Sequence, residues 1–332
     1  MEDRLPFEKI KREILVRKES SSGSYGVNPY ERNVDKLINY GVICLNKVQG
    51  PSSHQVADYV KKILDLKRCG HGGTLDPNVT GVLPIATGRA TRIVQALLNA
   101  GKEYVCLMIL HKELSEKEIF ESVTRLTGKI QQLPPVKSAI KRQLRTREIY
   151  YLNILEINGK NVLFKVGCEA GTYIRKLVFD WGKNLGTQAH MQELIRTKAG
   201  PFSYKEWVSL HDLKDAYEFY KEGDDTKIRE CIKPIEKAVE HLPKVWILDN
   251  AIGNVCYGSG IGVKAVSKVE DGINNNCLVA VVSLKNELIC IGKATMNSDE
   301  MIKKERGNIL RDVRVFMERG VYPKLLNASS NI

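Results

Sequence analysis

The order of apolar and polar residues predicts that strands and helices follow one another through the first two thirds of the chain. Residues 41–45 and 104–111 are apolar runs, which are typical of buried strands. Between them, apolar side chains across residues 56–64 recur at the spacing of one helix face, behind Ser52 or Ser53 as a capping residue. The pattern therefore predicts a strand, a helix and a second buried strand in this order.

Caps and turns mark the elements that follow. Ser115 opens a capping box, which predicts a helix start. Asn158 and Gly159 form a turn signal between two strand-like runs, and residues 172–185 are expected to form a helix that ends at Gly186. Because strands and helices interleave without a regular βαβ period, the expected fold class is α+β with a mixed or antiparallel sheet.

The pattern changes near residue 243. Beyond it, glycine-rich turns separate short apolar strands, which predicts a compact all-β module. Residues 1–37 are polar and include a Ser- and Gly-rich stretch, which is typical of an extension that crosses a surface. We therefore predict an extension at 1–37 that packs on the last module, a main domain at 38–242 and the β module at 243–327.

Charge and cysteine spacing narrow the classes of partner and site. The chain carries 51 Lys and Arg against 39 Asp and Glu, a formal net charge of +12, which favours an anionic partner such as nucleic acid. The eight cysteines form no Cys-x-x-Cys pair and the six histidines form no His-x-x-x-His pair, so we expect no metal site. No apolar run is long enough to cross a bilayer, so we expect no membrane association and reduced thiols in a cytoplasmic protein.

One stretch carries candidate chemistry. The segment from Gly70 to Pro84 holds a single carboxylate, Asp76, between a glycine-dense turn and Pro77. A lone acid on a stiff loop with open space around it suits a nucleophile or a general base. The alternative is an Asx-type turn in which Asp76 only bonds nearby amides.

The wording of this stretch, Gly-His-Gly-Gly-Thr-Leu-Asp-Pro and then Thr-Gly-Val-Leu-Pro, closely resembles the catalytic motif of the TruB family of pseudouridine synthases. It is most similar to the archaeal and eukaryotic, dyskerin-type branch, and the resemblance continues over nearly the whole chain. It implies an isomerase that converts uridine to pseudouridine in RNA, with Asp76 as nucleophile and no cofactor. It also implies that residues 243–327 form a PUA domain, a small pseudobarrel that binds structured RNA.

Further motifs imply partners for Asp76. The segment Gly-Thr-Tyr-Ile-Arg at 171–175 resembles the family motif whose arginine pairs with the catalytic aspartate, so Arg175 is expected there, with Tyr173 beside it. These two side chains face one site only if the backbone between them is extended. Tyr104 matches the family tyrosine that stacks on the extracted base. The alternative for Tyr104 is packing in the core.

The resemblance also suggests residues that contact RNA. His71 is expected near the flipped nucleotide, and Leu194 and Arg196 match the family's leucine beside the site and the arginine that follows it. Lys47 matches the first family motif, but the residues on either side of it depart from the usual Asp-Lys-Pro, which leaves both a structural and a catalytic role open. A basic segment at 134–147, with no acidic residue, resembles an RNA-clasping thumb. Its basic side chains are Lys137, Lys141, Arg142, Arg145 and Arg147.

Three functions compete at this stage. The first is the catalytic subunit of an H/ACA ribonucleoprotein that modifies ribosomal RNA at sites chosen by a guide RNA. The second is a stand-alone enzyme for uridine 55 of tRNA, and the third is a non-catalytic RNA-binding scaffold. The short distance between Tyr104 and Pro134 leaves no room for the insert of bacterial TruB enzymes, which favours the first.

The first function implies partners and a location. The expected partners are the guide RNA, the substrate rRNA or tRNA, a small Nop-type protein, a Gar-type protein and a kink-turn-binding ribosomal-type protein. Because the sequence lacks a long lysine-rich C-terminal tail, an archaeal, cytoplasmic protein is expected rather than a eukaryotic, nucleolar one.

Overall fold

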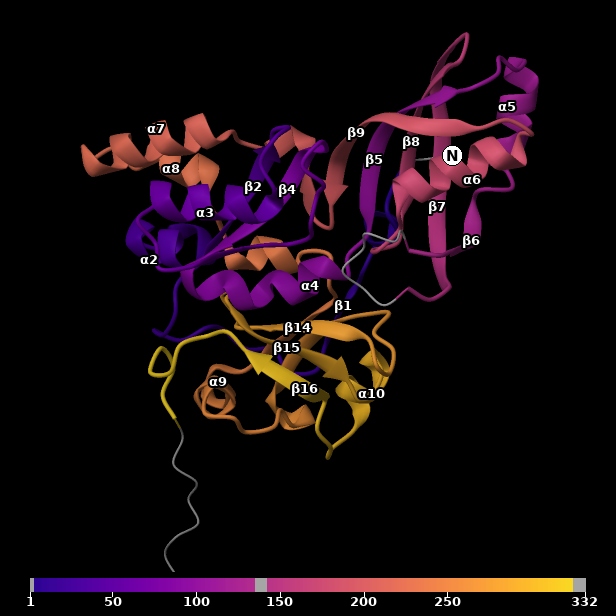
Figure 1. Cartoon of the computed structure of the whole chain (residues 1–332). Coiled ribbons are helices and arrows are strands. Elements are labelled where there is room, and N and C mark those ends of the chain that lie inside the picture. The colour runs from indigo at the N-terminus through magenta and orange to yellow at the C-terminus, as the bar shows by residue number, and fades with distance from the viewer. Residues whose placement is uncertain (1–2, 135–141, 325–332) are drawn as a thin grey trace, which may run out of the picture. The chain divides into compact units, whose positions relative to one another are not determined.

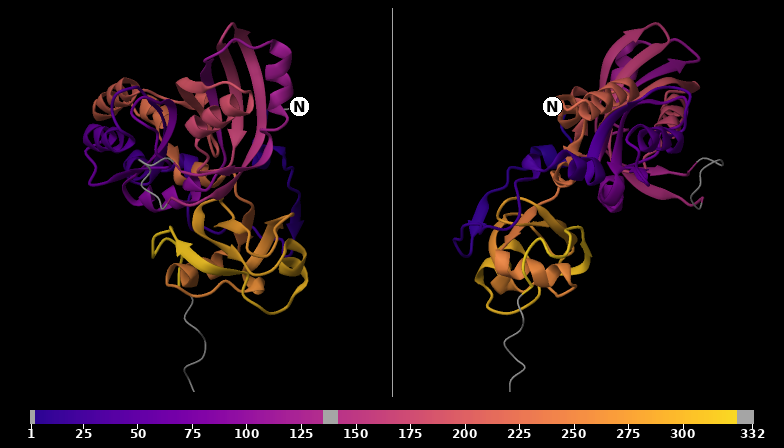
Figure 2. Two further views of the ribbon diagram at one scale, coloured as in Figure 1. Left: turned by 45° about the vertical axis from the view of Figure 1, so that its right-hand side comes forward. Right: turned by 90° about the vertical axis from the view of Figure 1, so that its left-hand side faces the viewer.

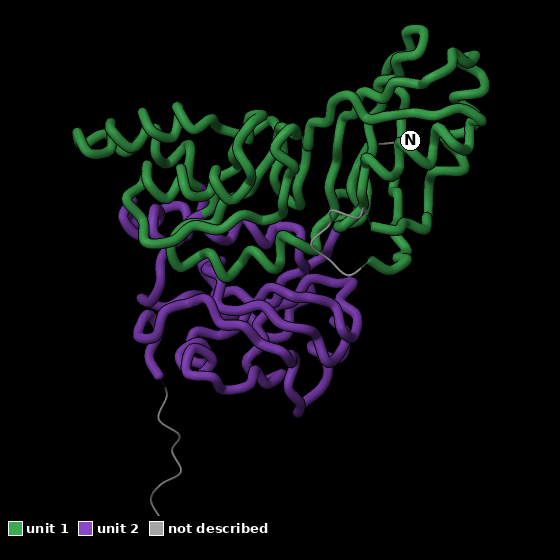
Figure 3. The backbone as a smooth tube through the Cα atoms, in the orientation of Figure 1, with its two compact units in different colours: residues 1–9, 42–232 green, residues 10–41, 233–332 purple. Residues whose placement is uncertain are grey.

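The computed structural model describes residues 3–134 and 142–324, which form two compact units. Unit 1 comprises residues 1–9 and 42–232, and unit 2 comprises residues 10–41 and 233–332 (Figure 3). The extension that we predicted at 1–37 is therefore divided between the two units. The other boundaries that we predicted, 38–242 and 243–327, remain a prediction.

Unit 1 is built on a mixed sheet (Figure 1). Its strands in spatial order are β2 (Gly41–Lys47), β4 (Thr80–Thr87), β9 (Ala189–Ala199), β5 (Lys102–Leu110), β8 (Asn161–Cys168), β7 (Arg145–Asn158) and β6 (Gly128–Gln132). Short strands β3 (Cys69–His71) and β10 (Phe202–Ser203) pair with β4 and β9. Strands β4 and β9 are parallel and the other neighbours are antiparallel, which confirms the mixed α+β architecture.

Several helices of unit 1 contact strands of this sheet. The helices of unit 1 are α1 (Pro6–Lys9), α3 (Ser53–Ile63), α4 (Val94–Leu98), α5 (Glu116–Val123), α6 (Ile174–Asn184), α7 (Leu210–Lys221) and α8 (Thr226–Cys231). Trp181 of α6 is fully buried against Phe164 of β8, and its indole Nε1 donates to Ser122 Oγ of α5. Helices α5 and α6 therefore lie together at the β7 and β8 side of the sheet (Figures 1 and 2). The predicted capping box at Ser115 is confirmed, and Gly186 follows α6 with a φ of +70°.

Unit 2 contains the predicted β module as a second mixed sheet. Its strands in order are β1 (Ile14–Val16), β13 (Val266–Glu270), β12 (Lys244–Ile247), β14 (Leu278–Val282), β15 (Leu288–Ala294) and β16 (Leu310–Val315). This unit also contains α2 (Val34–Asn39), α9 (Asp249–Cys256) and α10 (Ser298–Lys303). The module is therefore not purely β, because it contains α9 and α10. The sequence pattern did not predict these two helices. No helix in residues 3–134 or 142–324 is long and apolar enough to cross a membrane.

Candidate active site

Asp76 lies on the loop between β3 and β4, and this loop is anchored directly before it. The hydroxyl of Ser53, at the start of α3, accepts a hydrogen bond from Leu75 N (2.8 Å) and donates one to Leu75 O (3.1 Å). The Leu75 side chain is buried, whereas the Asp76 side chain is 56% exposed. The turn that follows is closed by a bond from Val79 N to the backbone oxygen of Asp76 (3.0 Å). The carboxylate is therefore presented to solvent on a backbone that is held on both sides.

The carboxylate of Asp76 forms an ion pair with Arg175. The guanidinium Nη2 lies 2.6 Å from Asp76 Oδ2, and both side chains are more than half exposed. A charge-assisted bond of this length orients the carboxylate. The predicted pairing of these two residues is present in the geometry. Their predicted catalytic roles remain a proposal.

Arg175 is the second residue of helix α6. The helix begins at Ile174, and the preceding Tyr173 still has an extended backbone (φ −94°, ψ 103°). Buried Gln132, at the end of β6, holds this point: its amide accepts from Tyr173 N (3.0 Å) and donates to Tyr173 O (3.2 Å). Tyr173 and Arg175 thus lie on either side of the junction between extended and helical backbone. Gln132 was missed in the sequence, because a glutamine near a proline pair carries no local signal for a contact with residue 173.

Lys47 supports the Asp76 loop from inside the protein. Its side chain is fully buried, and Nζ donates to the carbonyls of Val48 (3.0 Å), Pro77 (3.0 Å) and Val79 (2.8 Å). Burial lowers the pKa of Lys47, and the nearby Asp76 carboxylate acts in the opposite direction. An RNA contact by Lys47 has no support in this position, so the structural alternative is the better description.

Arg196 supports the same loop from the other side. It is 1% exposed, and its guanidinium donates to the carbonyls of Val82 (2.7 Å), Gly73 (3.1 Å) and Thr74 (3.4 Å). Burial lowers the pKa of Arg196. Gly81 of β4 lies opposite Arg196 of β9 with a φ of +107°, and a Cβ there would lie 2.3 Å from Arg196 O. Arg196 therefore holds the loop through its backbone, and a direct RNA contact by this buried side chain has no support.

Tyr104 lies directly across the β5–β9 ladder from Arg196. As a residue, Tyr104 is partly exposed. Burial raises the pKa of Tyr104, a hydrogen bond with Arg196 opposes this, and Asp76 adds to the increase. The phenol is thus near both Arg196 and the candidate nucleophile, Asp76. A flipped base could stack on its ring at this position.

A third buried cation, Lys102, was not singled out in the sequence. It is 5% exposed, and Nζ donates to the carbonyls of Leu97 (3.0 Å) and Leu98 (2.9 Å) at the end of α4 and of Ala100 (2.6 Å) just beyond it. Burial, with Arg196 nearby, lowers the pKa of Lys102 to about 7. The signal in the sequence was a lysine at the start of an apolar strand, two residues before Tyr104.

Two further predicted residues, His71 and Leu194, lie in strands β3 and β9. His71 of β3 is partly buried, its ring lies edge-on to that of His54 (6.3 Å between centroids), and burial lowers its pKa, which favours the neutral ring. Leu194 is buried in β9 opposite Cys106.

The basic segment is described only in part. Arg142 is exposed and Arg145 and Arg147 are partly buried, with Arg147 Nη1 at 3.9 Å from Glu169. Lys137 and Lys141 lie outside the described residues. Across residues 3–134 and 142–324, no group of three or more His, Cys, Asp or Glu side chains could hold a metal ion.

Comparisons with known families cover nearly the whole chain. Residues 61–174 match the TruB family pseudouridylate synthase (N terminal domain), and residues 175–240 match the tRNA pseudouridylate synthase B C-terminal domain. Residues 2–57 match the DKCLD (NUC011) domain, and residues 243–316 match the PUA domain.

Individual relatives are similar over the same length. The chain is 52% identical to "Probable tRNA pseudouridine synthase B" of Pyrococcus horikoshii, over 95% of this chain and 96% of the relative. It is 48% identical to the protein of the same name in Methanocaldococcus jannaschii, over 95% and 94%. Among solved structures, it is similar to a chain in a Cbf5–Nop10–Gar1 complex (TM-score 0.93, 50% identity, 97% and 99% covered). It is also similar to a chain in an H/ACA ribonucleoprotein bound to a substrate RNA containing 2′-deoxyuridine (TM-score 0.91, 48% identity, 97% and 100% covered).

Proposed function

The chain belongs to the TruB family of pseudouridylate synthases, of the dyskerin type with a PUA domain, and we propose that its reaction depends on the carboxylate of Asp76. The observation that carries this proposal is the 2.6 Å ion pair between Asp76 and Arg175 on an anchored, exposed loop. Pseudouridine formation breaks the N-glycosidic bond of a uridine, rotates the base and rejoins it to the ribose through carbon. One oriented carboxylate can serve this sequence as nucleophile or as base.

The neighbouring residues supply the remaining requirements of the reaction. A base must leave its stack to reach Asp76, and the partly exposed Tyr104 offers an aromatic face in exchange. Arg175 orients the carboxylate, while Lys47 and Arg196 hold the loop by four hydrogen bonds to its carbonyl groups. Tyr173 and His71 are proposed to contact the nucleotide on the grounds of the family resemblance alone. Asp76 is thus already oriented before RNA binds.

We propose that the substrate uridine is selected by an H/ACA guide RNA in ribosomal RNA. The similar solved chains come from complexes with Nop10, with Gar1 and with RNA, at about half identity over nearly the full length. The corresponding partners here are a small Nop-type protein, a Gar-type protein and a kink-turn-binding ribosomal-type protein. The PUA domain and the basic residues of 134–147 would hold the RNAs through their backbones. The relatives are archaeal, which supports a cytoplasmic location.

A second candidate substrate is uridine 55 of tRNA without a guide. The curated relatives are named as probable tRNA pseudouridine synthases, which favours this activity in addition to the first. The third possibility, a non-catalytic scaffold, is disfavoured because Asp76 and Arg175 are both present and paired.

A pseudouridine assay separates these functions. The full chain is incubated with a tRNA transcript, and with a ribosomal RNA fragment, in the presence and absence of a matching guide RNA and the partner proteins. Guided activity on the ribosomal fragment alone supports the first function, and unguided activity on tRNA supports the second. No pseudouridine under any of these conditions would favour the scaffold and contradict the proposal.

A further inference from the structure

A β-bulge lies beside Tyr104 in the β5–β9 ladder. Glu103 is opposite Lys198, but the next residue, Tyr104, is opposite Arg196, so Thr197 is an extra residue without a partner on β5. Bulges are enriched next to active sites, where they redirect a side chain. Here the bulge separates the pair of Tyr104 and Arg196 from the pair of Glu103 and Lys198.

The bulge decides which residue faces Tyr104. In a regular antiparallel ladder, Tyr104 would lie opposite Thr197, and Arg196 would lie opposite Val105. Residues directly opposite each other share one face of a sheet, and successive residues alternate between faces. Without the bulge, Arg196 would point to the face away from Tyr104. Its bonds to the carbonyls of Gly73 and Val82 depend on the observed register.

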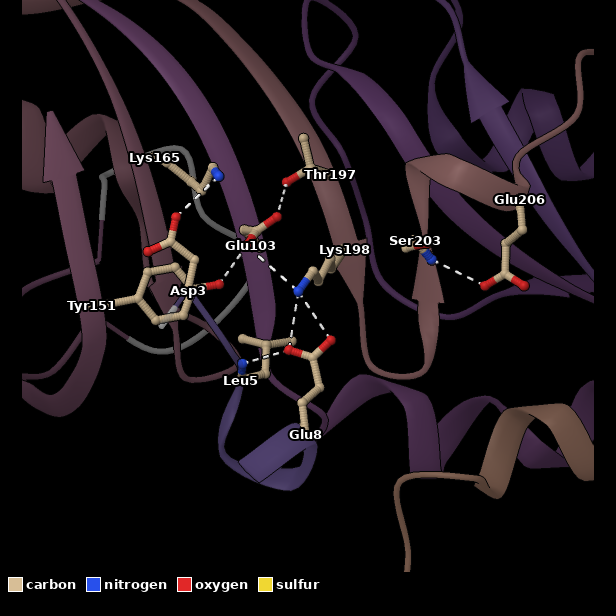
Figure 4. A network of polar contacts seen from close by, with 10 residues as sticks. All are labelled: Asp3, Leu5, Glu8, Glu103, Tyr151, Lys165, Thr197, Lys198, Ser203 and Glu206. Carbon is tan, nitrogen blue, oxygen red and sulfur yellow. Dashed lines mark hydrogen bonds and ion pairs between the residues drawn. The ribbon is translucent and has the colours of Figure 1, made fainter. Parts of the chain in front are cut away.

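A buried carboxylate on β5 holds the extra residue. Glu103 is 3% exposed, and its Oε1 accepts a hydrogen bond from Thr197 Oγ1 (2.8 Å). The Tyr151 hydroxyl donates to Oε2 of the same carboxylate, and Lys198 Nζ lies 3.7 Å from it (Figure 4). A buried carboxylate needs such donors to offset the loss of water. Glu103 therefore binds the bulged residue, Thr197, on the face of the sheet opposite Tyr104.

A glycine in the strand between them leaves room for the contact of Tyr151 with Glu103. Gly167 of β8 lies between Glu103 of β5 and Tyr151 of β7 in register. A Cβ at Gly167 would lie 2.3 Å from the Tyr151 ring, so the bare backbone lets that ring cross β8 to reach Glu103. This glycine is an independent sign that the network is specifically built.

Residues near the N-terminus extend the network of polar contacts around Glu103 and Lys198 (Figure 4). Both carboxylate oxygens of Glu8 lie 3.0 Å from Lys198 Nζ, and Glu8 Oε2 also accepts from Leu5 N (2.6 Å). Leu5 is fully buried, and Asp3 pairs with Lys165 (3.1 Å). The chain's first residues thus hold Lys198 beside the bulge.

We propose that Glu103, acting through Thr197, is a positioning residue for pseudouridine formation: it fixes the bulge that places Arg196 opposite Tyr104 and thereby supports the Asp76 loop. This inference rests on the proposed function of Asp76. Glu103 and Thr197 need not touch the RNA, because their effect passes through Arg196. Their loss should therefore slow the chemical step more than it weakens RNA binding.

The test compares Thr197→Val, which keeps the shape but loses the hydroxyl, with Thr197→Ser, which keeps the hydroxyl. Single-turnover rates at saturating tRNA transcript or guided complex, RNA affinity and thermal midpoint are measured for the full chain. Thr197→Val should slow the rate on the order of tenfold or more with RNA affinity within about twofold. Thr197→Ser should restore most of the rate. Lys165→Met, which removes only the outer pair with Asp3, is the matched control and should keep the wild-type rate.

Three results would overturn the inference: an unchanged rate in Thr197→Val, no recovery in Thr197→Ser, or a loss in Thr197→Val that saturating RNA abolishes. If Thr197→Val does not fold, Tyr151→Phe carries the test. It removes one donor to Glu103 and should slow the saturated rate severalfold, and an unchanged rate overturns the inference equally. An inactive wild-type protein would instead refute the proposed function, so the two failures are distinguishable.

Discussion

Asp76 and Arg175 lie 99 residues apart in the chain, yet their side chains meet at 2.6 Å. One comes from a loop that two buried cations hold by its carbonyls, and the other comes from the second residue of α6. The pair is exposed, although the residues that support it are buried. Because the ion pair is exposed and its supporting residues are buried, a substrate can reach Asp76 without a conformational change of the protein.

Replacing Arg175 should separate catalysis from stability. Exposed ion pairs contribute little to folding, so Arg175→Ala should change the free energy of unfolding by at most about 0.5 kcal/mol. The rate should fall on the order of a hundredfold, because the carboxylate loses the planar partner that orients it. Arg175→Lys keeps the charge and should recover only part of this loss. A rate in Arg175→Ala equal to that of the wild type would mean that the pair has no role in the reaction.

Tyr104→Phe and Tyr104→Ala should differ in substrate binding. Stacking on a base needs only the ring, so the Phe variant should bind RNA nearly as well as the wild type. The Ala variant should lose about 1–3 kcal/mol of binding free energy. The comparison is made by titrating a fluorescent substrate RNA. Equal losses in both variants would show that the hydroxyl near Arg196, not the ring, makes the main contribution.

Lys47→Met should destabilise the protein without weakening RNA binding. The substitution leaves the buried Val79 carbonyl and the partly buried Val48 and Pro77 carbonyls without their donor, which should lower the free energy of unfolding by about 2–3 kcal/mol. Lys62→Met, on the exposed face of α3, is the control and should stay within about 0.5 kcal/mol of the wild type. Denaturant unfolding measures both. A stable Lys47→Met protein that binds RNA poorly would restore the RNA contact first predicted for this lysine.

Lys102 should make stability depend on pH. Burial lowers its pKa to about 7 in the folded protein. An unfolded lysine titrates near about 10.4, so between about pH 7 and pH 10 the unfolded state binds more protons than the folded state. The free energy of unfolding must therefore rise with pH across that window. Below the window the lysine is charged in both the folded and the unfolded state, so the destabilising effect of its burial is fully present.

Urea unfolding of the wild type and of Lys102→Met over this window isolates the effect. The difference in unfolding free energy, wild type minus variant, should rise by at most about 1.4 kcal/mol per pH unit. A difference that is flat or falls with pH would contradict the lowered pKa.

The features that sequence could predict are those with local causes. The capping box at Ser115, the Asn158 and Gly159 turn and the glycine after α6 depend on residues within a few positions of one another, and all three are present. The pairing of Asp76 with Arg175 was predicted from the resemblance, not from local physics.

The features that were missed have non-local causes. Lys47 and Arg196 were assigned to RNA from the family motifs that they match, but both side chains are buried against carbonyl groups that come together only in the fold. Gln132 contacts Tyr173 across 41 positions, and the bulge at Thr197 depends on Glu103 of another strand. Short helices such as α10 carry too few residues for a clear periodic pattern.

The most direct test of the central claim is pseudouridine formation by Asp76→Asn. The substitution is nearly isosteric but removes the charge and the nucleophile, and affinity for RNA comes mainly from phosphate contacts elsewhere. We expect no detectable pseudouridine on a substrate that the wild type modifies, with RNA affinity within a few-fold. Measurable turnover by Asp76→Asn, in a preparation free of deamidated protein, would show that another residue carries the chemistry.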